Sequence, residues 1–211
     1  MPGTIAFAAE RPAIVRKGIL LSYFTIGYNC LEAVVSLVAG FLAGSIALVG
    51  FGIDSVIEVT ASGVAQWRLR MDVHTSKRPG SELIALRIIG WSFLALAVYV
   101  TTDSIRSLYL REEPDRTWLG LSILLLSVVV MPILARAKRR VANAMDSRAL
   151  EAEAKQTSLC AYLSVIALIG VALNVLVGWW WADPIAALGM VPIIAKEGLH
   201  GVRATLAEDC C

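Results

Sequence analysis

The chain has 211 residues, of which 57% are hydrophobic and 17% are charged. Globular domains carry roughly 25% charged residues, so this composition excludes an ordinary soluble domain. The formal net charge of +2 gives no reason to expect a nucleic-acid partner. The four cysteines have no framework spacing, which argues against a disulfide scaffold. The segment before residue 18 lacks the apolar run of a cleavable signal peptide, so none is expected.

Six apolar segments follow one another, and a bilayer core requires about 20 mostly apolar residues per helix. Their periodicity is helical, and no series of short alternating segments suggests a membrane barrel. We therefore predict an all-α, polytopic membrane protein with six transmembrane helices within residues 18–203. An N-terminal segment (1–17) precedes them and a short tail (204–211) follows. The predicted segments are 18–43, 45–67, 83–110, 118–135, 150–180 and 184–202.

Basic residues are concentrated on alternate connections of the chain. They precede the first segment, follow the second and follow the fourth, whereas the other connections are short, acidic or rich in tryptophan. The positive-inside rule therefore predicts that both termini are cytoplasmic, in a protein of the cell (inner) membrane. These basic residues are Arg11, Arg16, Lys17, Arg68, Arg70, Lys77, Arg78, Arg136, Lys138, Arg139, Arg140 and Arg148.

Two acids, Asp54 and Glu58, lie in the middle of the second segment. At this spacing they share one face of a helix, one turn apart. Acids in hydrocarbon are costly and normally face a bundle interior or an aqueous path. Two such acids repel one another unless a proton or a cation lies between them. The pair indicates cation handling, with a role in stabilising the bundle as the alternative.

Gln156 and Cys160 repeat this spacing near the start of the fifth segment. Taken alone the pair is weak evidence, because a membrane cysteine is usually a packing residue and a glutamine usually joins helices. Asn29 and Glu32 lie one turn apart on the first segment. They are predicted either to line an ion path or to form hydrogen bonds between helices.

Four motifs in chain order resemble the transmembrane domain of the cation diffusion facilitator family, whose members export zinc and related divalent metals in exchange for protons. The resemblance covers nearly the whole chain. It implies a metal site at mid-membrane formed by Asp54, Glu58, Gln156 and Cys160. The motifs are NCLE at 29–32 with GSIAL at 44–48, GIDSVIE at 52–58, AEAKQTSLCAYLS at 152–164 and WADPIAA at 181–187.

The fifth segment departs from the family pattern, which usually has His and Asp where this chain has Gln156 and Cys160. A thiolate favours softer ions, and Zn²⁺ accepts mixed sulfur and oxygen ligands. Zinc is therefore the first candidate, with cadmium, cobalt or copper as alternatives. Gln156 offers only a neutral carbonyl oxygen, so it either binds the metal directly or supports a ligand.

The end of the chain is a second departure, because family members commonly continue into a cytoplasmic α/β domain that binds metal and supports dimerisation. A homodimer is the family expectation. Cys210 and Cys211 could capture metal in a cytoplasmic tail, with a solvated terminus as the alternative. A redox role for this pair is disfavoured because adjacent cysteines make poor dithiol partners. Asp183 followed by Pro184 predicts the start of the sixth helix.

The predicted function is secondary active transport that exports a divalent metal cation, zinc first, from the cytoplasm in exchange for protons. No covalent chemistry is implied, so the protein is not expected to be an enzyme or to hold a resident cofactor. The predicted partners are the metal ion, protons, the lipid bilayer and a second copy of the chain. The alternative is a membrane metal sensor or accessory protein that does not transport.

Overall fold

A computed structural model of the protein describes residues 3–71, 79–145 and 148–203. Within these ranges the chain forms helices and no strands. Each helix contains a stretch that is long and apolar enough to cross a membrane, which confirms the prediction of six transmembrane helices. The helices are α1 (Gly3–Ala43), α2 (Ile46–Met71), α3 (Pro79–Leu110), α4 (Trp118–Met145), α5 (Arg148–Val177) and α6 (Ala182–Arg203).

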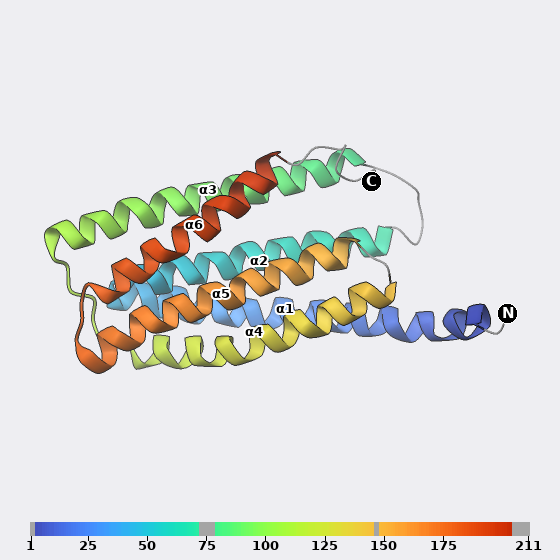
Figure 1. Cartoon of the computed structure of the whole chain (residues 1–211), viewed down its shortest axis with the longest axis horizontal. Coiled ribbons are helices and arrows are strands. Elements are labelled where there is room, and N and C mark those ends of the chain that lie inside the picture. Colours follow the sequence, from blue (N-terminus) through green and yellow to red (C-terminus); the bar gives the residue numbers. More distant parts are fainter. Residues whose placement is uncertain (1–2, 72–78, 146–147, 204–211) are drawn as a thin grey trace.

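Successive helices run in opposite directions (Figure 1). The start of α1 and the end of α6 consequently lie on the same side of the bundle, as an even number of crossings requires. Two turns on the opposite side contain glycines with positive φ, Gly44 (65°) and Gly178 (77°). Residues with a Cβ rarely adopt this conformation, so glycine ends α1 and α5 sharply.

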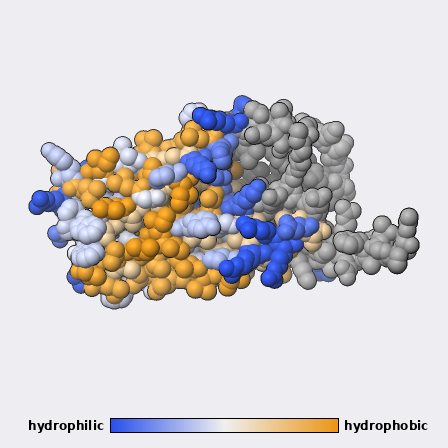
Figure 2. Space-filling view, in the orientation of Figure 1, coloured by the Kyte–Doolittle hydropathy of each residue, from blue (hydrophilic) through white to orange (hydrophobic). Residues whose placement is uncertain are grey.

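The surface of the bundle carries an apolar belt (Figure 2), with hydrophilic side chains beside it toward both ends. Large apolar side chains on this surface are strongly exposed, including Leu42 at 78% and Trp91 at 62%. A soluble protein rarely exposes so continuous an apolar surface, because water disfavours it. Together with the six apolar helices, the belt identifies a multi-pass membrane protein.

The helices pack as a group of four (α1, α2, α4 and α5) beside a pair formed by α3 and α6 (Figure 1). Glycines allow the α3–α6 pair to approach backbone to backbone. A Cβ on Gly90 would lie 2.8 Å from the Gly198 carbonyl oxygen, and a Cβ on Gly198 would lie 3.0 Å from the Gly90 carbonyl oxygen. Without water between them, membrane helices associate through such close van der Waals contact.

The pair also contacts the group of four at the start of α2, where Asp183 of α6 caps that helix. The Asp183 carboxylate accepts hydrogen bonds from Ser45 Oγ at 2.5 Å, Ile46 N at 2.8 Å and Ala47 N at 3.4 Å. Ser45 Oγ in turn accepts a hydrogen bond from Leu48 N at 3.2 Å. The first N–H groups of a helix have no partner within it, so these two side chains satisfy them. The motifs at 44–48 and 181–187 therefore meet in the fold, where they form one contact between the start of α2 and the start of α6.

The observed helices differ from the predicted segments at several ends. The apolar span of α1 is Gly18–Ala43, as predicted, although the helix itself begins at Gly3. α5 runs from Arg148 to Val177 because Gly178 ends it. α4 continues to Met145, ten residues beyond the predicted end, so Lys138 and its basic neighbours belong to a helix rather than to a loop. The apolar part of the sequence ends near residue 135, but the helical hydrogen bonds continue beyond it. Hydropathy therefore locates the end of the apolar part and not the end of the helix.

Candidate metal site

The four side chains predicted as metal ligands all face the interior of the group of four helices. Asp54 and Glu58 lie on α2 and are 1% and 0% exposed, and Gln156 and Cys160 lie on α5 and are 9% and 0% exposed. α2 and α5 pack against one another along this face. At 1.5 Å rise per residue, Asp54 and Glu58 lie about 12 and about 18 Å from the start of α2. The acids are therefore deep within the membrane-spanning part.

Glu58 belongs to a hydrogen-bonded chain that joins three helices. Thr157 of α5 donates a hydrogen bond to Glu58 Oε1 at 2.6 Å. Lys138 of α4 donates to Thr157 Oγ1 at 2.8 Å, and its Nζ lies 3.9 Å from the same Glu58 oxygen. Both charged side chains are almost fully buried, at 1% and 0% exposure.

Sequence reasoning missed both Thr157 and Lys138, although the sequence contains a signal for the lysine. Lys138 follows the buried positions Met131 and Ala135 and precedes Ala142, at the three- and four-residue spacing of one helix face. Thr157 gives no comparable signal, because it is one of several small polar residues near the start of α5.

Asn29 and Glu32 of α1 are fully buried and face the same interior. Ser55 of α2 donates a hydrogen bond to Glu32 Oε2 at 2.9 Å, which links the acid of α1 to the helix that carries Asp54. The arrangement is consistent with both predicted roles for Glu32, since the residue forms a hydrogen bond between helices and also faces the acids of α2. Ser55 was not singled out from the sequence.

Several oxygens of these acids have no hydrogen-bond partner although they are buried. They are both oxygens of Asp54, Oε2 of Glu58 and Oε1 of Glu32. Buried carboxylate oxygens without partners are costly, and the cost is relieved by a proton or a cation. The donor set therefore fits a metal cation in chemical type.

Cys160 completes the polar cluster from the side of α5. Its thiol is fully buried on α5, which packs against the helix that carries Asp54 and Glu58. Across the described residues, however, no three His, Cys, Asp or Glu side chains are arranged as a group that could hold a metal ion. The candidate ligands share one interior face, and metal binding requires their side chains to move toward one another.

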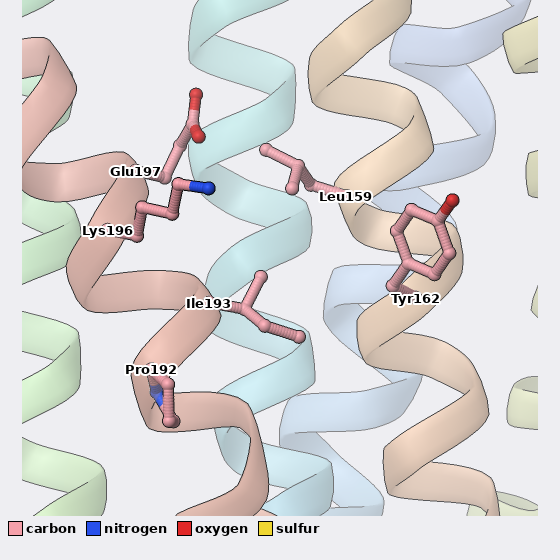
Figure 3. Close-up of a pocket in the computed structure, with 6 residues that line it drawn as sticks. All are labelled: Leu159, Tyr162, Pro192, Ile193, Lys196 and Glu197. Carbon is pink, nitrogen blue, oxygen red and sulfur yellow. The ribbon is translucent and has the colours of Figure 1, made fainter.

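A groove of about 380 Å³ opens between α5 and α6 (Figure 3). Glu197 of α6 lines this groove. The helix rise places Glu197 about 21 Å beyond Asp183, and Asp54 about 12 Å beyond Ile46 at the same level. Glu197 therefore lies between Asp54 and the side where the bundle has both its ends. The groove is lined by Leu159, Tyr162, Pro192, Ile193, Lys196 and Glu197.

The proposed tail ligands Cys210 and Cys211 lie outside the described residues. The other two cysteines are Cys30, which is exposed on α1, and Cys160, which is buried.

Comparison with known proteins identifies the family of the chain. The family described as the cation efflux transmembrane domain matches residues 22–208. Transmembrane protein 163 of Xenopus laevis is 26% identical over 64% of this chain and 48% of its own length. An uncharacterized transporter of Synechocystis is 23% identical over 79% of this chain and 56% of its own length. The magnetosome protein MamB of Paramagnetospirillum magneticum is 29% identical over 80% of this chain and 59% of its own length. The chain thus spans about half of the curated relatives that it matches.

Proposed function

Because the chain belongs to the cation efflux transmembrane-domain family, we propose that it is a secondary active transporter of a divalent metal cation. Transport would export the ion from the cytoplasm in exchange for protons. The proposal is supported most directly by the buried acids of the bundle, because both oxygens of Asp54 and one oxygen each of Glu58 and Glu32 lack hydrogen-bond partners. Ions bound at such a depth reach either side by alternating access.

The charge of the buried cluster matches a divalent ion. Among the residues whose side chains the structure describes, three carboxylates (Glu32, Asp54 and Glu58) and one ammonium (Lys138) are enclosed in the group of four helices. With these four groups ionised and the Cys160 thiol protonated, their sum is −2, which one divalent cation or two protons neutralise. Binding of the metal by a Cys160 thiolate releases one further proton.

The choice of metal is argued from the donors. Asp54 and Glu58 supply hard carboxylate oxygens, and Cys160 supplies a soft thiolate once it loses its proton. Zn²⁺ accepts this mixture in tetrahedral geometry, with the Gln156 carbonyl oxygen as a fourth donor. We therefore propose zinc as the first substrate, with cadmium or cobalt as weaker substrates. The groove at Glu197 is the proposed access from the cytoplasm.

Flux measurements in proteoliposomes test the proposal directly. An imposed pH gradient is expected to drive Zn²⁺ flux through the wild-type protein. The Asp54→Ala/Glu58→Ala variant is expected to show no such flux. The exposed acid Glu113 provides a matched control, and Glu113→Ala should leave flux unchanged. Metal binding without flux for Zn²⁺, Cd²⁺, Co²⁺ and Mn²⁺ would overturn transport and favour a sensor or accessory protein.

A further inference from the structure

Lys138 is the one residue of its basic run whose charge is buried. The side chain is 1% exposed, whereas Arg136, Arg139 and Arg140 on the same turns of α4 are exposed. An ammonium group in the interior of a bundle costs several kcal/mol unless an opposite charge and hydrogen bonds compensate it. Its position therefore requires compensating partners, and Glu58 is an acid that the structure places within ion-pair distance of it.

Thr157 fixes how the two charges meet. Its hydroxyl accepts a hydrogen bond from Lys138 and donates one to Glu58, so its donor and one acceptor position are both in use. The direct distance from Lys138 Nζ to Glu58 Oε1 is 3.9 Å, within ion-pair range but beyond a hydrogen bond. One Glu58 oxygen is thereby held, and the other, Oε2, remains without a partner.

We propose that Lys138 is a tethered counter-cation that occupies Glu58 in the metal-free protein and that the transported ion displaces. The inference rests on the proposed function, because it assumes that Glu58 binds the cargo. Lys138 is a positioning residue: it orients Glu58 through Thr157 and does not bind the metal. The ammonium group lowers the affinity for metal by repelling it and by competing for the same carboxylate.

Competition between Lys138 and the metal for Glu58 would help the transporter to release its ion. A site of three acids without a lysine would hold a divalent ion more tightly and release it more slowly. A cation on a flexible four-carbon stem returns to Glu58 as the metal leaves, so the acid is never left buried without a partner. Lys138 therefore favours release while keeping the empty bundle folded.

Metal binding to purified variants tests this role. Lys138→Met keeps the length and the apolar stem but removes the charge, and it should lower the zinc concentration at half-saturation by about tenfold while slowing turnover. Arg140→Met, an exposed neighbour on α4, should change neither quantity. Thr157→Val keeps every charge and breaks the relay between Lys138 and Glu58, and its zinc concentration at half-saturation should fall by about threefold. A folded Lys138→Met protein, or a Thr157→Val protein, with unchanged or weaker zinc binding would overturn the proposal.

A double-mutant cycle without metal separates this inference from the proposed function. The melting temperatures of wild type, Lys138→Met, Glu58→Gln and the double variant are compared in metal-free detergent solution. Each single change should lower the melting temperature, and the double change should lower it by less than their sum, because it removes both charges. Additive shifts would overturn the pairing. Coupled shifts together with a wild-type protein that binds no metal would overturn the proposed function and the displacement by metal, and would leave the pairing of Lys138 with Glu58 standing.

Discussion

Two equally buried aspartates lie along α2 in opposite conditions, Asp183 of α6 at the start of the helix and Asp54 of α2 itself near its middle. At the start of the helix, Asp183 is 1% exposed and accepts three hydrogen bonds. Two turns further along α2, Asp54 is also 1% exposed, and neither of its oxygens has a partner. Burial is therefore the same at a structural acid and at a candidate ligand. The difference lies in whether the protein itself satisfies the carboxylate.

The largest effect on transport is expected at Asp54, and it distinguishes this acid from Asp183. Asp54→Asn should reduce proton-driven zinc flux by at least about 100-fold, because it removes a charge on which binding depends. The melting temperature of the metal-free protein should stay the same or rise, since a buried charge without partners is lost. Flux in proteoliposomes and thermal unfolding in detergent provide the two measurements. Retention of normal flux would remove Asp54 from the site.

The reverse pattern is expected at the capped end of the helix. Asp183→Ala leaves the first N–H groups of α2 without acceptors and should destabilise the protein by about 2–4 kcal/mol. Thermal unfolding would show this as a lower melting temperature, and the surviving folded protein should still bind zinc. A variant that folds normally but fails to bind zinc would place Asp183 in the site and break the comparison.

A smaller effect, on selectivity, is expected at Cys160. Cys160→Asp replaces a soft donor by a hard one and should lower the ratio of zinc to manganese transport by about tenfold. Competition between the two ions in one flux assay measures the ratio directly, and Cys30→Ser on the exposed face of α1 serves as the control. An unchanged ratio would show that the thiol does not contact the ion.

The smallest expected effect sharpens the description of the cap. Ser45→Ala removes one hydrogen bond to Asp183 and one from Leu48 N, while the Ile46 and Ala47 N–H groups keep their acceptor. The loss should be about 1 kcal/mol, below that of Asp183→Ala. Melting temperatures of the two variants, measured in the same detergent, test the order. A larger loss for Ser45→Ala would show that the serine, and not the aspartate, is the main cap.

Six helices, their interior acids and their resemblance to a family of metal exporters could be predicted from the sequence. The length of an apolar segment and the positions of charged residues within it are local properties of the sequence. They determine, for each helix separately, whether it can cross a bilayer. The faces carrying Asp54 with Glu58 and Gln156 with Cys160 could be predicted for the same reason, because residues four apart share a helix face. Their placement against one another across α2 and α5 is seen only in the fold.

The partners of these acids were decided by the tertiary structure. Lys138 was interpreted as a loop residue because hydropathy falls near residue 135, yet the helix continues and its side chain points inward to Glu58. Asp183 was predicted only to begin its own helix, and it also caps α2, from which it is 137 residues distant in sequence. A sequence determines which groups must be satisfied in a membrane, since each buried charge has a local cost. Which distant group satisfies them depends on how helices far apart in the chain pack together, and that is settled only by the folded bundle.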